Sequence, residues 1–425
     1  MKREHYTIQI GKFGLQVGHE YWKEIFSELN SNFKRSHCQD KFSFFKESSC
    51  GKIVPRAILF DLEPRTLNKL QNSTFSKFYP SLNIVSDNRS TGGNWANGYI
   101  GADKNKENIE NVIRKNIEES DQMPFFDIFH SLEGGTGSGS GSYILEMIKD
   151  EFLGKFVTSY PLIPNQKKIS NTVIQPYNSI LSIRWLTLYA DSVVFFENSS
   201  IEKIISSHNK NVKLHMYQIN SLIAKIITTI KMSEIYPELS KNNIETLFNT
   251  LTPVNGLHFF TAAVSNFSTK GKKDPLLTDQ RGSSFSISNC TIPISFEDGK
   301  LISSFHILNR NPLQNNIYEH LKKSYKKSEM KFIEWAPPSI HYTNLFDFSK
   351  RKNFIEMCLY NHSSLKKIFE KVLSEYDCLK KRNAFLNDYL KEFNSENTFN
   401  LFQDARETVY SLIKNYAATD ATFFP

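Results

Sequence analysis

The chain has 425 residues, of which 40% are apolar and 23% charged, and its formal net charge is +8. This length exceeds what one ordinary hydrophobic core holds, so two or three domains are expected. The longest apolar runs have only strand length, which argues against a membrane-spanning segment. The five cysteines include no C-x-x-C pair and the lysines alternate with acids, which disfavours a zinc site and a nucleic-acid-binding protein.

The first two hundred residues alternate between predicted strands and predicted helices. Strands are expected at 6–10, 53–62, 125–130, near 156 and near 193, and helices at 17–29, 103–117, 141–152 and 176–188. This alternation is typical of an α/β fold with a doubly wound parallel sheet, in which ligands bind beyond the carboxyl ends of the strands.

The second half of the chain predicts a different architecture. Apolar residues between Ile219 and Ile230 recur at intervals of three and four, which indicates a long helix that ends before Pro237. Strands are expected at 257–264, 303–308 and 340–345, a loop at 394–398, and helices at 364–382 and 405–418. We therefore expect three domains, at 1–213, 214–360 and 361–425.

The most informative segment is a glycine-rich run, Ser131-Leu-Glu-Gly-Gly-Thr-Gly-Ser-Gly-Ser-Gly141, between a predicted strand and a predicted helix. Its glycines can adopt positive φ and bring backbone N–H groups close to a ligand, and the start of the helix favours an anion. The run matches neither the P-loop nor the dinucleotide-binding fingerprint. A flexible linker has a similar composition but is not expected between an apolar strand and an apolar helix. We therefore predict a polyphosphate-binding loop.

This run resembles the G-G-T-G-S-G signature of the tubulin family. Further segments are similar to other nucleotide-binding loops of the family: 11–18 to its first phosphate turn, 61–64 to its magnesium-facing loop, 93–98 to its third loop and 171–178 to its ribose-side loop. Residues 376–386 and 405–409 look like the gamma branch. The resemblance covers nearly the whole chain. It implies a GTP-binding domain, a long central helix, a second α+β domain and a C-terminal helical ridge.

Carried over residue by residue, the resemblance implies a site for GTP or GDP. Its phosphate-binding residues would be Gly135, Thr136, Gly137 and Ser138, with Asn94 near the terminal phosphate. Asp61 and Glu63 would orient Mg²⁺ through water, although such a pair could instead cap a helix that begins at Pro64. Asn220 and Glu202 would face the guanine. The remaining cofactor-binding residues would be Gly11, Lys12, Phe13, Gln16 and Gln175.

Several positions depart from the family pattern, and each departure weakens an expected contact without necessarily abolishing binding. These positions are Lys12, Phe13, Leu15, Gly93, Glu133, Glu202 and Met216. Lys12 could hold a phosphate directly or be balanced by Glu133. Met216 stands where an aromatic ring would stack on the base. Hydrolysis is less well supported, because Thr246 stands where alpha-tubulin has its glutamate and the neighbouring Glu245 and Asn243 look like helix-surface residues. We expect no catalytic residue and at most a slow GTPase.

The resemblance also implies a function and partners. Copies of the chain, held laterally by gamma-tubulin complex proteins, would dock alpha-beta-tubulin dimers and nucleate microtubules at a microtubule-organising centre, either a centrosome or a spindle pole body. A self-polymerising filament GTPase is disfavoured by the two C-terminal helices. A dehydrogenase is disfavoured by the glycine pattern and because His130 and His258 look like core residues. A degenerate tubulin scaffold that binds no nucleotide stays open, given the substitutions in the site.

Overall fold

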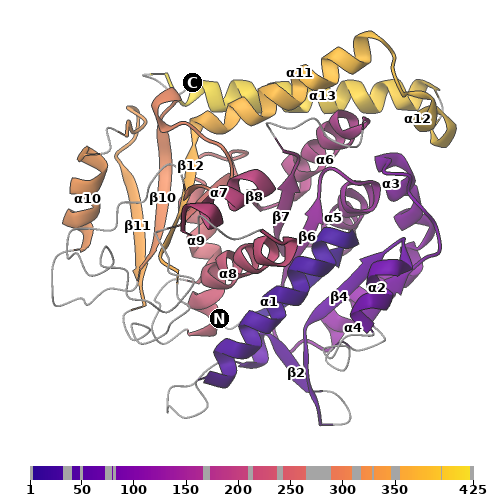
Figure 1. Ribbon diagram of the computed structural model, residues 1–425, viewed down its shortest axis with the longest axis horizontal. Helices are drawn as coiled ribbons and strands as arrows, with labels where there is room; N and C mark the ends of the chain where they lie inside the picture. Colours follow the sequence, from indigo (N-terminus) through magenta and orange to yellow (C-terminus); the bar gives the residue numbers. More distant parts are fainter. Residues whose placement is uncertain are drawn as a thin grey trace. The chain divides into compact units, whose positions relative to one another are not determined.

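The computed structural model describes residues 3–31, 41–47, 51–71, 79, 83–165, 173–208, 214–236, 243–264, 289–308, 317–327, 330–345, 355–393 and 395–421 (Figure 1). The chain divides into two units. The first comprises Met1–Phe26, Asp40–Val194 and Phe369–Ser411, and the second comprises Ser27–Gln39, Phe195–Ile368 and Leu412–Pro425. The expected division into three domains stays a prediction.

The first unit contains a parallel sheet with the strand order β7-β6-β1-β4-β5. These strands are β1 (Glu4–Ile10), β4 (Ala57–Asp61), β5 (Ile84–Ser86), β6 (Pro124–Ser131) and β7 (Phe156–Ile163). Four of the five are buried along nearly their whole length, as expected when both faces of a parallel sheet are covered. The prediction of an α/β fold with a parallel sheet is therefore confirmed.

Helices alternate with these strands along the chain. They are α1 (Gly11–Ser31), α2 (Pro64–Gln71), α3 (Trp95–Lys104), α4 (Lys106–Glu118), α5 (Gly141–Glu151) and α6 (Gln175–Tyr189), and β8 (Ser192–Glu197) follows α6. The helix expected over 103–117 is in fact two helices, because the chain turns at Asn105, whose side chain donates to the carbonyl of Gly101 at 2.9 Å.

The prediction of a single strand over 53–62 is wrong. Residues Ile53–Pro55 form β3, which pairs antiparallel with β2 (Phe45–Glu47), whereas β4 joins the parallel sheet. Arg56 lies between them: its N–H donates to the carbonyl of Phe44 at 3.0 Å, and its carbonyl accepts from Thr7 at 2.9 Å. The chain therefore passes from the hairpin to the sheet at this one residue.

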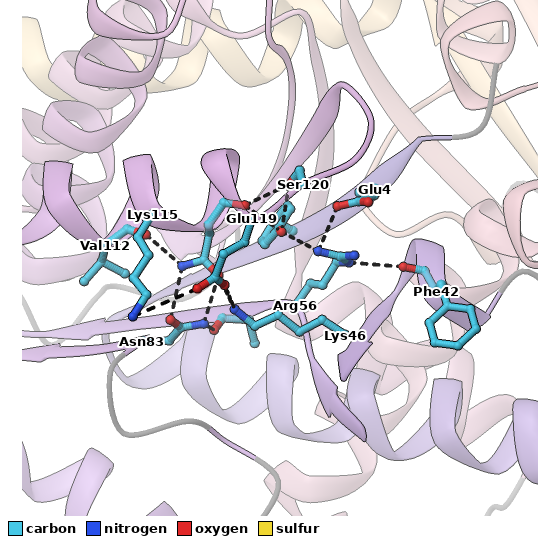
Figure 2. Close-up of polar contacts among 12 residues, drawn as sticks. Glu4, Phe42, Lys46, Arg56, Asn83, Val112, Lys115, Glu119 and Ser120 are labelled. Atoms are coloured by element: carbon cyan, nitrogen blue, oxygen red, sulfur yellow. Dashed lines mark hydrogen bonds and ion pairs between the residues drawn. The ribbon is translucent and has the colours of Figure 1, made fainter. Parts of the chain in front are cut away.

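Buried polar contacts join the amino ends of the parallel strands (Figure 2). Arg56, 5% exposed, pairs with Glu4 at 2.8 Å and also donates to the hydroxyl of Tyr6. That hydroxyl donates to the carbonyl of Asn116 at 2.8 Å, and the side chain of Asn116 donates to that of Asn83 at 3.1 Å. This end of the sheet is thus cross-linked by side chains of the protein itself.

The second unit is a mixed α+β structure. Its helices are α7 (Asn198–His208), α8 (Met216–Ile235), α9 (Ile244–Leu251) and α10 (Ile317–Lys327), and its strands are β9 (Phe259–Val264), β10 (Leu301–Leu308), β11 (Ser339–Asn344) and β12 (Met357–His362). Strand β12, which the sequence did not predict, runs antiparallel to both β9 and β10. The predicted long helix is confirmed as α8, whose apolar stripe is buried.

Three helices follow β12: α11 (Lys366–Lys381), α12 (Asn387–Glu392) and α13 (Ser395–Ala418). In Figure 1, α11 and α13 lie side by side, and Arg406 bonds both carboxylate oxygens of Asp377 at 2.9 and 3.0 Å. The loop expected at 394–398 is wrong for Ser395–Thr398, which begin α13; Asn394 lies outside the described residues. No helix in the described parts of the chain is long and apolar enough to span a membrane.

Candidate functional site

Three segments with predicted ligand contacts meet at the carboxyl end of the parallel sheet. Strand β1 leads directly into Gly11, β4 ends at Asp61, and β6 ends at Ser131, where the glycine run begins. Because these strands are parallel neighbours, their carboxyl ends share one edge of the sheet. The strand order therefore brings the three segments to one edge of the sheet, and their ligand contacts stay a prediction.

The glycine run folds into a turn of π-helix, Thr136–Ser140, that continues into α5. The helix thus begins five residues before the expected start at 141. No side chain among the described residues caps this turn, and the first amides of a helix have no acceptor within it. The N–H groups of Gly135 to Gly137 can therefore point toward a bound anion.

The expectation that the glycines of the run adopt positive φ is wrong. None of the five glycines in the run adopts positive φ. They are required by close approach instead: a Cβ on Gly139 would lie 2.0 Å from the carbonyl of Trp95, and one on Gly137 would lie 2.8 Å from that of Ser131. A Cβ on Gly134 would meet nothing within 4 Å among the described residues, so the turn is open there.

The first phosphate turn is also helical. Helix α1 begins at Gly11, six residues before the expected start at 17, because Gly11 has a φ of +66° and reverses the chain within one residue. A Cβ on Gly11 would lie 3.3 Å from the amide nitrogen of Gly137, so the two turns touch. In the first two turns of α1, Lys12 is exposed, whereas Phe13 and Gln16 are half-buried.

The third loop lies directly against the glycine turn. Gly92 and Gly93 have φ of +57° and +72°, a conformation that glycine adopts without steric cost. Asn94, 2% exposed, caps α3 through its Oδ1, which accepts from Ala96 at 2.7 Å. Its Nδ2 is buried without a hydrogen-bond partner among the described residues. A buried donor of this kind fits a ligand that supplies an acceptor oxygen.

The two acidic residues have different environments. Asp61 is 3% exposed, and its Oδ1 accepts from the N–H of Glu63 at 3.1 Å, just before α2. Burial and, to a lesser degree, the charge of Glu63 raise the pKa of Asp61 to about 6. Glu63 is exposed and accepts from the hydroxyl of Ser90 at 3.2 Å. Two carboxylates at this edge fit a hard cation whose other ligands are water and phosphate oxygens.

His130 lies behind the glycine turn, a position whose importance the sequence did not indicate. Its two ring nitrogens bond the carbonyl of Gly137 at 3.0 Å and the hydroxyl of Ser159 at 2.8 Å. Burial lowers the pKa of His130 to about 4. It is thus a satisfied core residue, as predicted, but one of its partners belongs to the phosphate-binding turn.

The ribose-side segment begins α6. Asn171 and Thr172 lie outside the described residues, and Gln175 is a buried residue in the first turn of the helix. Asn178, one turn later and fully buried, donates to the carbonyls of Gly93 at 2.7 Å and Glu133 at 2.9 Å. It therefore ties the third loop to the glycine run, a role that a sequence pattern does not reveal.

The remaining predicted residues belong to the second unit. Asn220 is buried in the second turn of α8, Glu202 is half-buried on α7, and Met216 is 54% exposed at the first position of α8. Among the residues considered for a role in hydrolysis, Asn243 caps α9 by accepting from the N–H of Thr246 at 2.7 Å. Asn243 and Thr246 thus bond each other at the start of that helix.

Together these features define a class of protein. A parallel sheet, an uncapped glycine turn at the carboxyl end of a strand and a buried unpartnered amide beside it are typical of an α/β protein that binds a phosphorylated ligand. The geometry fits phosphate groups through backbone amides rather than through a lysine of the P-loop kind.

Comparison with known proteins gives the family. Residues 4–206 match the Tubulin/FtsZ family GTPase domain. The whole chain is 31% identical, over 429 aligned residues, to the nucleomorph tubulin gamma chain of Guillardia theta, and the alignment covers 98% of each protein. The chain belongs to the tubulin family, as a gamma-tubulin-like member. It is a GTP-binding protein of that family.

Proposed function

We propose that the chain binds GTP or GDP at the carboxyl end of its parallel sheet and, when loaded, nucleates microtubules. The observation that carries the nucleotide site is the pairing of the uncapped turn at Gly135–Gly137 with the unpartnered Nδ2 of Asn94. The amides would hold phosphate oxygens, and Asn94 would donate to the terminal phosphate.

The other contacts in this proposal divide between the two ends of the nucleotide. Asp61 and Glu63 orient a magnesium ion through water, and that ion would neutralise phosphate charge. Thr136, Ser138, Gly11 and Lys12 lie on the phosphate side. Phe13, Gln16 and Gln175 contact the nucleoside, and Asn220 and Glu202 read the guanine edge. The exposed Lys12 adds a positive charge on the first turn of α1.

Extraction of the purified protein and chromatography of the released nucleotide test the site directly. We expect guanine nucleotide in near-equal molar amount, and Asn94→Ala should release most of it at the same protein concentration. Asn97→Ala is a matched control, because its side chain bonds the carbonyl of Thr91 at 3.1 Å, in the same loop. An empty wild-type pocket would favour the scaffold without nucleotide.

For nucleation, the support is the similarity to a gamma chain over 98% of the length. In this proposal, gamma-tubulin complex proteins hold copies of the chain side by side, so that alpha-beta-tubulin dimers dock on a preassembled ring at a centrosome or spindle pole body. Preassembly removes the entropy cost of forming the first contacts between subunits. That cost makes the formation of the first contacts the slow step of unassisted polymerisation.

A light-scattering assay of alpha-beta-tubulin polymerisation tests this function. The reconstituted ring should shorten the lag phase several-fold at a fixed tubulin concentration, and isolated subunits should shorten it less. Filaments formed by the chain alone in the presence of GTP would instead favour a self-polymerising GTPase. No change in lag with the assembled ring would overturn the nucleation proposal.

A further inference from the structure

Asn178 has a fourth contact that leads away from the nucleotide loops. Its Oδ1 accepts both from the backbone N–H of Trp95 at 2.9 Å and from the hydroxyl of Tyr389 at 2.8 Å, while its Nδ2 serves Gly93 and Glu133. A primary amide has two donors and two acceptor sites, so its capacity is used in full. The Tyr389 hydroxyl thus occupies the second acceptor site of the Asn178 amide, which also bonds the third loop and the glycine run.

Tyr389 is a buried residue of α12, in the corner between α11 and α13, which we define as residues 382–393. Its ring packs against Tyr177 and Phe402, with centroids 5.6 and 5.2 Å apart. The hydroxyl of Tyr177 donates to the carbonyl of Ala384 at 2.9 Å. Two hydrogen bonds therefore link the corner to the first turn of α6.

The corner itself has an unusual backbone. Asn383 and Phe385 have φ of 46° and 59°, in the left-handed region that non-glycine residues rarely adopt. Such conformations cost free energy and persist only where surrounding contacts impose them. The N–H groups of Asn383 and Ala384 donate to carbonyls in the last turn of α11, at 2.9 and 3.2 Å, and the inner side of the corner adds the contacts at Ala384 and Tyr389.

We propose that Asn178 and Tyr389 form a positioning pair that couples this corner to the phosphate-binding loops. The pair rests on the proposed nucleotide site, since Gly93 and Trp95 flank Asn94, and Glu133 precedes the open glycine turn. A bound nucleotide that fixes those loops also fixes the orientation of the Asn178 amide, and hence the acceptor for Tyr389. Coupling between two sites is reciprocal, so the corner in turn affects nucleotide affinity.

Tyr389→Phe removes one hydroxyl and leaves the ring packing intact. We expect the affinity for GDP and GTP, measured by calorimetry, to fall about threefold to tenfold, because a buried acceptor of Asn178 loses a partner. Tyr376→Phe is the matched control: this tyrosine is also buried, and its hydroxyl bonds the carbonyl of Phe402 at 3.5 Å. The control should keep wild-type affinity with a comparable change in thermal stability.

Amide hydrogen exchange separates coupling from a general loss of stability. In nucleotide-free protein, Tyr389→Phe should speed exchange at 92–97 and 134–138, whereas Tyr376→Phe should not. In the wild type, GTP should slow exchange at 386–393, and Tyr389→Phe should abolish that effect. Unchanged loop exchange in Tyr389→Phe overturns the pair. A wild type that binds no guanine nucleotide overturns the proposed function instead, and the nucleotide-free exchange still decides the pair.

Discussion

The amino and carboxyl ends of the parallel sheet both contain buried polar groups, but these groups find their partners differently. At the amino end, Arg56 pairs with Glu4 and donates to Tyr6, whose hydroxyl donates to the carbonyl of Asn116 (Figure 2). At the carboxyl end, glycines bring backbone segments together and Asn94 retains an unpartnered buried amide. Buried polar groups that pair internally stabilise the fold, whereas a buried donor without an internal partner is available to a ligand. The comparison therefore separates polar residues that bond within the protein from those that we propose to bind the ligand.

The largest effect is expected at the amino end. Arg56→Met leaves Glu4 buried without its counter-charge, which should lower the free energy of unfolding by about 3–5 kcal/mol. Nucleotide affinity per folded molecule should stay unchanged. Arg89→Met is the control, since Arg89 is 54% exposed and pairs with Asp87 at 3.5 Å. Urea unfolding and calorimetry measure both quantities; an affinity loss in Arg56→Met would contradict the separation of the two ends.

A smaller but more selective effect is expected from Gly98→Ala. Its Cβ would lie 2.1 Å from the carbonyl of Gly135, so α3 and the glycine turn must move apart. We expect a loss of about 1–3 kcal/mol in stability together with at least a tenfold loss of nucleotide affinity.

Gly134→Ala gives the contrast, because its Cβ meets nothing within 4 Å among the described residues. The thermal midpoint should match the wild type. A drop in the midpoint of Gly134→Ala equal to that of Gly98→Ala would show that the open side of the turn is packed.

Asp61→Asn should raise the stability of the folded protein, whereas most substitutions of buried residues lower it. Burial raises the pKa of Asp61 to about 6, so between about pH 4 and 6 the folded state binds more protons than the unfolded chain, and stability falls as pH rises. Above pH 6 the buried carboxylate is ionised at a cost. The amide removes that cost, so the nucleotide-free variant should be about 2 kcal/mol more stable at pH 7.5.

This gain should shrink to nothing near pH 4, which urea unfolding across the pH range can follow. A gain that is the same at all pH values would mean that the charge of Asp61 is not its source. Magnesium-dependent nucleotide affinity should fall in the same variant, because the asparagine lacks the charge that a hard cation prefers.

The smallest expected effect concerns Lys12. Because this side chain is exposed, a phosphate contact from it is screened by solvent, and Lys12→Ala should weaken nucleotide binding only about two- to fivefold. Raising the salt concentration should narrow the difference between variant and wild type. Unchanged affinity at low salt would remove Lys12 from the site.

The fold that positions the carboxyl-end segments was largely predictable because its signal is local. A glycine run between an apolar strand and an apolar helix, together with strand–helix alternation, indicates both the ligand class and the edge of the sheet. The sequence did not reveal which of two glycine properties was in use, positive φ or close approach. That depends on which backbone packs against the run, here the segment from Asn94 to Tyr99.

The parts that could not be predicted depend on distant partners. Strand β12 is recognised only through pairing with β9 and β10, which lie far away in the chain. Asn178 is one amide in a short run, and its importance comes from contacts with Gly93, Glu133, Trp95 and Tyr389. The ligand-binding roles of all the predicted site residues stay predictions.

One consequence concerns the histidine behind the glycine turn. Histidine is the side chain whose ordinary pKa lies closest to physiological pH, and here the ring of His130 bonds the carbonyl of Gly137 in the glycine turn. With the pKa of His130 lowered to about 4 by burial, only about one molecule in a thousand carries the extra proton at pH 7. Protonation of His130 therefore leaves its bond to the carbonyl of Gly137 undisturbed near neutral pH, and a response of this edge to mild acid must come from other groups, such as Asp61 with its pKa of about 6.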